Sequence, residues 1–144
     1  MPYWRLFYHF VWGTKRGEPF IQPAWARDLH NVIAAKATDL EAVVHAVGGI
    51  DNHVHLVVSI PPKIALSTFI GQVKGHTSHW INHSLSPDHA FAWQGEYGVV
   101  SFDATKLDRI VQYVHNQPQH HAARTLIHVL ERIAPPVTSL HPPP

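Results

Sequence analysis

The sequence predicts an α+β domain in which an antiparallel sheet carries helices packed mainly on one face. Two observations support this class. Segments rich in β-branched and aromatic residues alternate along the chain with segments whose apolar residues recur at helical spacing. The length of 144 residues suits a single domain that buries a core of its own.

The first half of the chain predicts a strand, a helix and a β-hairpin. Residues 3–14 are apolar on both faces, as in an interior strand, and a loop with glycine and proline follows. Pro23 suits the first position of a helix that extends to about Thr38. Residues 41–47 and 51–60 read as two strands joined by a turn that contains Gly48 and Gly49.

The second half predicts two helices around one or two short strands, and then a further helix. The expected ranges are a helix over 64–83, strands within 91–100, a helix over 104–117 and a helix over 119–133. Asp103 is the expected N-cap of the third helix, and Pro118 is expected to stop it. The order β-α-β-β-α-β-α is typical of ferredoxin-like domains. We expect one domain over residues 1–133 and a disordered, proline-rich tail over 134–144.

Composition excludes several classes of protein. The chain has no Cys, so it is not a disulfide scaffold. No apolar run approaches the roughly 20 residues that span a bilayer, and we expect a cytoplasmic protein without a membrane partner. The formal net charge of +1 neither requires nor excludes a polyanionic partner.

His53 and His55 are the first candidates for chemistry. Side chains of a strand alternate between its faces, so both imidazoles point the same way while Val54 and Leu56 point the other. Two imidazoles roughly 7 Å apart along a strand can bind one divalent ion. The alternative is a half-buried strand that carries histidine on its solvent face, and the chain has 14 His.

Two further patterns lie on the predicted helices. His76, His79 and His83 have the spacing of a helical metal site, but a polar helix surface would look the same, and we favour that interpretation. Tyr113 lies roughly 110° from the middle of the apolar stripe of its helix, with Gln117 one turn further along the same edge. The ordinary alternative is a tyrosine at the edge of the core whose hydroxyl lies in water.

Four segments in order resemble the small single-tyrosine transposases of bacterial insertion sequences, which belong to the HUH endonuclease superfamily and include relatives associated with REP sequences. The segments are Tyr8-His9-Phe10-Val11-Trp12-Gly13-Thr14-Lys15, Asp51-Asn52-His53-Val54-His55-Leu56-Val57-Val58, Lys74-Gly75-His76-Thr77-Ser78 and Tyr113-Val114-His115-Asn116-Gln117-Pro118-Gln119-His120-His121. An isolated His-x-His motif is weak evidence for a family. The set of four segments is strong evidence, because they follow in order and cover most of the chain.

The resemblance implies a site and a reaction. His53, His55 and Gln117 would hold a divalent metal, Mg²⁺ or Mn²⁺, and Tyr113 would be the nucleophile. The implied enzyme cleaves single-stranded DNA at hairpin-marked ends of an element. It forms a 5′-phosphotyrosine and a free 3′-hydroxyl, and rejoins strands by the reverse step.

The resemblance also implies DNA contacts and a partner subunit. The candidate phosphate contacts are Lys15, Arg16, Lys74, Lys106 and Arg109. The segment from Lys15 to Phe20 matches the family's Lys-x-Arg-x-Pro pattern only loosely. Members of the family work as homodimers in which the tyrosine helix can complete the partner's site, and a nucleoid-associated enzyme is expected.

Two other functions remain open at this stage. One is a domesticated protein of the same fold that binds hairpin DNA without cleaving it. The other is a metal-binding ferredoxin-like module unrelated to DNA, which the histidine content suggests. Covalent capture of single-stranded DNA separates the transposase from both.

Overall fold

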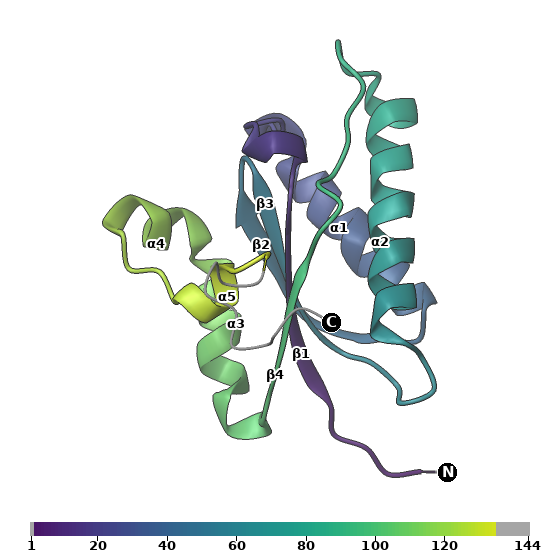
Figure 1. Cartoon of the computed structure of the whole chain (residues 1–144), viewed down its shortest axis with the longest axis vertical. Coiled ribbons are helices and arrows are strands. Elements are labelled where there is room, and N and C mark those ends of the chain that lie inside the picture. The colour runs from purple at the N-terminus through teal and green to yellow at the C-terminus, as the bar shows by residue number, and fades with distance from the viewer. Residues whose placement is uncertain (1, 135–144) are drawn as a thin grey trace, which may run out of the picture.

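The computed structural model describes residues 2–134, which form one four-stranded antiparallel sheet with helices on both faces (Figure 1). The strands lie in the order β2-β3-β1-β4. The strands are β1 Phe7–Gly13, β2 Val43–Ile50, β3 His53–Ser59 and β4 Gly98–Phe102. The helices are α1 Pro23–Asp39, α2 Leu66–Trp80, α3 Leu107–His115, α4 Gln117–Ala123 and α5 His128–Glu131. Three short helical segments are the 3₁₀-helices η1 Lys15–Gly17 and η3 Ala104–Lys106 and the π-helix η2 Ile81–Leu85.

The strand order confirms the predicted α+β class. β3 lies between β1 and β2 and is antiparallel to both, which is the split β-α-β arrangement of ferredoxin-like domains. The histidine strand is therefore an interior strand. The predicted hairpin of β2 and β3 is confirmed, with Val43 opposite Ser59 at one end and Ile50 opposite His53 at the other. The turn consists of Asp51 and Asn52, whereas Gly48 and Gly49, expected in the turn, pair with β3 inside β2.

The two long helices lie on one face of the sheet. Phe10, Trp12 and Leu56 project from β1 and β3 into a core shared with α1 and α2. The apolar stripes that predicted these helices are the buried ones, for example Leu29 in α1 and Val73 in α2. Burial of these stripes holds both helices against the sheet.

The opposite face carries three short helices, which the sequence predicted as two longer ones. Val57 of β3 packs there with Val114 of α3 and Leu130 of α5 in a second, smaller core. Pro118 has no N–H to donate to the Val114 carbonyl, and the chain turns at Asn116 before α4 begins. The expected helix over 104–117 thus ends at His115.

The end of the chain departs from the single helix expected there. The helix expected over 119–133 is divided into α4 and α5 because Arg124 adopts a left-handed conformation, with φ of 56°. The tail expected at 134–144 lies outside the described residues apart from Ala134. Within residues 2–134, no helix is long and apolar enough to cross a membrane.

Candidate active site

His53 and His55 lie side by side on the face of β3 that α3, α4 and α5 cover. His55 is fully buried, and the His53 side chain is 12% exposed. Their ring centroids are 5.0 Å apart. This placement confirms that the alternation of the strand brings both imidazoles to one face, while Val54 and Leu56 enter the opposite core.

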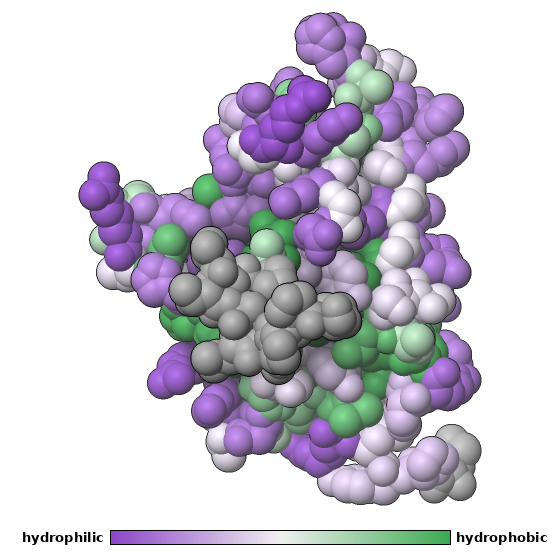
Figure 2. All heavy atoms as spheres, in the orientation of Figure 1, coloured by the Kyte–Doolittle hydropathy of each residue, from purple (hydrophilic) through white to green (hydrophobic). Residues whose placement is uncertain are grey.

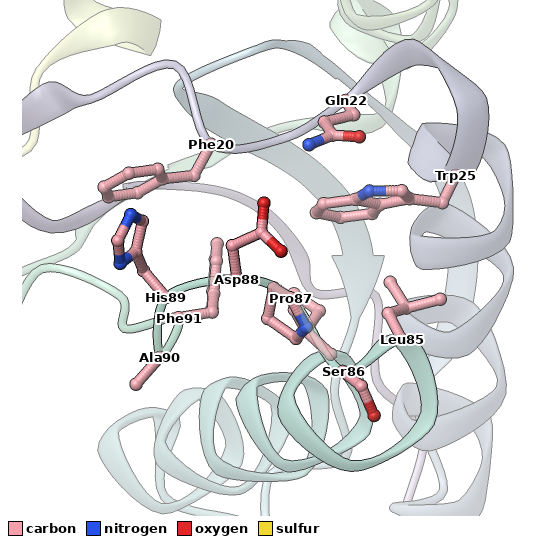
Figure 3. Close-up of a pocket in the computed structure, with 11 residues that line it drawn as sticks. Phe20, Gln22, Trp25, Leu85, Ser86, Pro87, Asp88, His89, Ala90 and Phe91 are labelled. Carbon is pink, nitrogen blue, oxygen red and sulfur yellow. The ribbon is translucent and has the colours of Figure 1, made fainter.

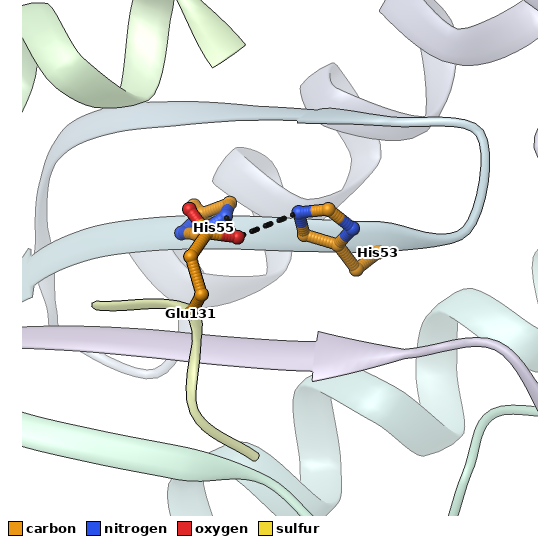
Figure 4. Close-up of side chains that lie close together, drawn as sticks. All are labelled: His53, His55 and Glu131. Atoms are coloured by element: carbon orange, nitrogen blue, oxygen red, sulfur yellow. Dashed lines mark ion pairs between the residues drawn. The ribbon is translucent and has the colours of Figure 1, made fainter. Parts of the chain in front are cut away.

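Glu131, at the end of α5, places its carboxylate against both histidines (Figure 4). Its Oε1 lies 3.1 Å from His53 Nε2 and 3.3 Å from His55 Nε2. The side chain is 14% exposed. Among the described residues, these three form the one group of His, Cys, Asp or Glu side chains whose donor atoms are close enough to share a metal ion.

Tyr113 and Gln117 reach the same cluster from α3 and from the first residue of α4. The Tyr113 hydroxyl donates a hydrogen bond to Glu131 Oε2 and accepts one from the Ile127 N–H at 3.1 Å. Gln117 is fully buried, with Oε1 3.3 Å from His53 Nε2 and Nε2 donating to Glu131 Oε2 at 3.2 Å. The alternative of a tyrosine hydroxyl in water is therefore wrong, because Tyr113 is only 3% exposed.

Burial and the close packing of these groups shift their pKa values. Burial, together with the hydrogen bond to Glu131, raises the pKa of Tyr113 to about 12. Burial alone would raise the pKa of Glu131, but the His53 and His55 rings, 3.1 and 3.3 Å from its carboxylate, hold that pKa well below its usual range. Tyr113 is thus a protonated donor at neutral pH, and Glu131 is an ionised acceptor.

The donor set fits a divalent cation. His55 Nε2 is a buried atom without a hydrogen-bond partner, although it faces the Glu131 carboxylate. A nitrogen lone pair in that position suits a metal ligand. Separations of 3.1–3.3 Å between the histidine nitrogens and the Glu131 and Gln117 oxygens match adjacent ligands of an octahedral ion, which lie about 3 Å apart for bonds of about 2.1 Å. His121 borders this set, since its Nε2 donates to Gln117 Oε1 at 3.0 Å.

Sequence reasoning did not identify Glu131 as a site residue. The residue lies 18 positions after Tyr113, in a segment that the apolar stripe marked only as a helix. One signal was available: Glu131 is the only acidic residue from Arg109 to the end of the chain. A lone carboxylate among histidines is a candidate ligand, but its position opposite β3 depends on the turns after α3.

Comparison with known proteins identifies the family. The family described as "Transposase IS200 like" matches residues 2–117, which is most of the chain. The chain belongs to the IS200-like transposase family. The matched range includes His53, His55, Tyr113 and Gln117, whereas Glu131 lies beyond it. A comparison with curated proteins gives no match.

Two solved structures share the fold of this family member. A candidate transposase from Deinococcus radiodurans is 23% identical with a TM-score of 0.65, and the alignment covers 81% of this chain and 95% of that one. A REP-associated tyrosine transposase bound to a REP hairpin is 15% identical with a TM-score of 0.61, over 84% of this chain and 74% of that one. Both confirm the fold class, and with the family match they confirm the resemblance to single-tyrosine HUH transposases.

The five candidate phosphate contacts of this family member lie in three places. Lys15 and Arg16 are exposed in η1. This segment lies at the upper end of the molecule in Figure 1, where Figure 2 shows mainly hydrophilic side chains. Lys106 and Arg109 are exposed around the start of α3, at the opposite end of the sheet (Figure 1). Lys74 is half-buried and donates to the carbonyl oxygens of Gln94 at 2.6 Å and Glu96 at 3.1 Å. Lys74 therefore holds the segment before β4, in addition to any DNA contact.

A separate pocket of about 410 Å³ lies between the loop after η1 and the end of α2 (Figure 3). Phe20, Trp25 and Phe91 supply its aromatic walls, and the Asp88 carboxylate lies between the rings of Phe20 and Trp25 in this view. The Lys15 N–H donates to the Ala92 carbonyl at 3.0 Å, which brings η1 next to this pocket. The pocket shares no residue with the histidine cluster.

Proposed function

We propose that this family member is a metal-dependent transposase that cleaves and rejoins single-stranded DNA through a covalent bond to Tyr113. One observation carries the proposal: Tyr113, Gln117 and Glu131 converge on His53 and His55 within a single chain. Two of the four segments that resemble the family thereby contribute side chains to one cluster, although His53 and Gln117 lie 64 residues apart.

His53, His55, Gln117 and Glu131 are the proposed ligands. We propose Mg²⁺ or Mn²⁺ as the ion, because a set of two nitrogen and two oxygen donors leaves room for the phosphate. Such an ion polarises the scissile phosphate and stabilises charge on its oxygens. Gln117 is locked in place, since its amide also donates to Glu131 and accepts from His121.

Tyr113 is the proposed nucleophile. Its oxygen attacks the phosphorus, the Tyr113–phosphorus bond forms and the bond to the 3′-oxygen breaks, which leaves a 5′-phosphotyrosine and a 3′-hydroxyl. The hydroxyl proton already points to Glu131 Oε2, so that oxygen is its proposed acceptor, and the departing 3′-oxygen takes up a proton from water. Attack by another 3′-hydroxyl reverses these changes and joins the strands without ATP.

The proposed substrate is single-stranded DNA that carries a hairpin. The REP-associated relative is described as bound to a REP hairpin, and this chain shares its fold. Lys15, Arg16, Lys106 and Arg109 supply exposed positive charge at the two ends of the sheet. A homodimer with exchanged tyrosine helices stays a prediction. Exchange is not needed to bring the two groups together, because one chain already places the Tyr113 and His55 ring centroids 6.1 Å apart.

Covalent capture tests the proposal. The protein is incubated with Mn²⁺ and hairpin-bearing single strands labelled at either end, and adducts are separated on a denaturing gel. We expect an adduct that retains only the 3′-end label, because the tyrosine keeps the 5′-phosphate. Tyr113→Phe is expected to lose the adduct and keep DNA binding, whereas Tyr3→Phe, at a side chain that is 85% exposed, keeps both.

A non-cleaving hairpin-binding protein is the alternative, favoured by the coverage of the site. Tyr113 and His55 are buried beneath α4 and α5, and the Tyr113 hydroxyl is already hydrogen-bonded. Hairpin binding by gel shift without any adduct, in Mn²⁺ and in Mg²⁺, would support this alternative and overturn the enzyme.

A further inference from the structure

A second buried histidine stands directly behind His55. His9 of β1 is 1% exposed, and its Nε2 lies 2.7 Å from His55 Nδ1. In the register of β1 and β3, His9 pairs with Val57 and Val11 pairs with His55, so the two histidines are diagonal neighbours on one face of the sheet. The contact therefore follows from the strand pairing and not from a mobile side chain.

His9 and His55 are two buried imidazoles that share one hydrogen bond. A neutral imidazole has one N–H and one nitrogen lone pair. Since a distance of 2.7 Å requires a hydrogen bond, one ring donates and the other accepts. Either His9 Nε2 donates to His55, or His55 Nδ1 donates to His9.

The far side of the His55 ring distinguishes these two arrangements. If His9 donates, the proton of neutral His55 sits on Nε2, where Glu131 Oε1 lies 3.3 Å away, and Nε2 has no lone pair for a metal. If His55 Nδ1 donates to His9, Nε2 carries the lone pair that a metal ligand requires. A His55 that binds an ion through Nε2 must therefore carry its proton on Nδ1, and His9 Nε2 faces that atom at 2.7 Å.

His53 shows the same arrangement with a different partner. Its Nδ1 lies 2.7 Å from Asn52 Oδ1, an oxygen that can only accept. The orientation of this amide is supported by its other end, because Asn52 Nδ2 donates to the Gly17 carbonyl at 3.3 Å. Both histidines of β3 thus have Nδ1 held from behind and Nε2 directed into the cluster with Glu131.

We propose that His9 is a positioning residue that accepts a hydrogen bond from His55 Nδ1–H and keeps Nε2 of His55 as a free electron-pair donor for the divalent ion. This proposal rests on the metal site of the proposed function. Partners of this kind orient metal-binding histidines and set their tautomer. His9 does not touch the ion or the DNA, so its effect on metal binding passes entirely through His55.

The tautomer of His55 is measurable without metal or DNA. In the full-length protein with a chelator, ¹⁵N-edited NMR of the imidazoles is expected to show His55 protonated at Nδ1. Leucine at position 9 cannot accept a hydrogen bond from His55 Nδ1–H. In His9→Leu we therefore expect the proton of His55 on Nε2, where Glu131 Oε1 can accept it. His55 protonated at Nε2 in the unaltered protein would overturn the proposal. Absence of Mn²⁺ binding would instead overturn the proposed metal site, and the NMR assignment of the His55 tautomer would still be valid.

Metal affinity gives the second measurement. Calorimetry with Mn²⁺ is expected to show a loss of about 10–100-fold for His9→Leu. His9→Gln is expected to recover much of the affinity, because an amide oxygen can accept from Nδ1–H. The control is His45→Leu, which removes a histidine of β2 that bonds Ser59 and not the cluster. A folded His9→Leu variant that binds Mn²⁺ as tightly as the unaltered protein would contradict the proposal. So would a His9→Gln variant that loses as much Mn²⁺ affinity as His9→Leu. If His9→Leu does not fold, the NMR result and His9→Gln decide.

Discussion

Gly48 of β2 is a point of very close approach between α3 and the sheet. A Cβ added to Gly48 would lie 2.1 Å from the carbonyl oxygen of Val114, the residue after Tyr113. Contacts of a Cβ with other atoms are normally 3.4 Å or longer. Because the obstructing atom belongs to the backbone of α3, rotation of a side chain cannot relieve the clash. Gly48→Ala must therefore displace α3 from β2 by about 1 Å.

The size of this displacement sets two expected effects. Overpacking of this kind costs about 1–3 kcal/mol in the free energy of unfolding. A misplacement of about 1 Å at reacting groups can cost about 100-fold in rate. The Tyr113 hydroxyl would move relative to Glu131 and His55, whereas His53 and His55 would stay on β3. Gln117, a proposed ligand four residues after Tyr113, moves with α3, so we expect a folded protein that binds Mn²⁺ more weakly and forms the covalent DNA adduct about 100 times more slowly.

Gly71→Ala is the matched control. Gly71 lies in α2, and a Cβ there would have no atom within 4 Å. Alanine in a helix is favoured over glycine by about 0.5–1 kcal/mol, so this variant is expected to be slightly more stable and equally active. Urea unfolding and time courses of adduct formation supply the comparison. Equal stability and equal rates for Gly48→Ala and the unaltered protein would refute the close approach of α3 to β2.

Three other predictions follow from single contacts. Glu131→Gln removes the charge beside both histidines while keeping the shape of the side chain, so calorimetry should show weaker Mn²⁺ binding; an unchanged affinity would exclude Glu131 as a ligand. Asn82 holds the segment before β4 through two hydrogen bonds, donating to the Phe91 carbonyl at 2.9 Å and accepting from its N–H at 2.7 Å; Asn82→Ala should cost about 1–3 kcal/mol by urea unfolding, and no cost would contradict this role. Folding lowers the pKa of His9 from 6.5 to about 3, so between these pH values the unfolded chain binds one proton more than the folded chain. The contribution of His9 to the free energy of unfolding is complete above pH 6.5 and is lost as the pH falls towards 3, at up to about 1.4 kcal/mol per pH unit. Unfolding of the metal-free protein should show a lower free energy at pH 5 than at pH 7.

The sheet and its histidines were predictable because their signals are local. Alternation along residues 51–60 placed His53 and His55 on one face, and the structure confirms it. The spacing of Phe69, Ile70 and Val73 likewise predicted the buried side of α2. In each case the pattern depends on neighbours within one element.

The elements after β4 were harder to predict. Tyr113 lies at the edge of its apolar stripe, and periodicity alone left its hydroxyl in water or at a site. In the structure the hydroxyl is enclosed because α5 returns to the sheet after the turn at Arg124. At Gly98, an added Cβ would lie 1.9 Å from the carbonyl oxygen of Arg132, which shows how closely this segment approaches β4. A pattern with helical period contains no information about that approach.

The sequence by itself determined the α+β class, the shared face of His53 and His55 and the family resemblance, because strand alternation, helical spacing and ordered motifs depend on neighbouring residues. Only the tertiary structure decided that Glu131 joins His53 and His55 and that His9 stands behind His55. These contacts link residues 76 positions apart for Glu131 and His55 and 46 positions apart for His9 and His55. Their formation depends on strand pairing and on how two turns direct the end of the chain, which no local period encodes.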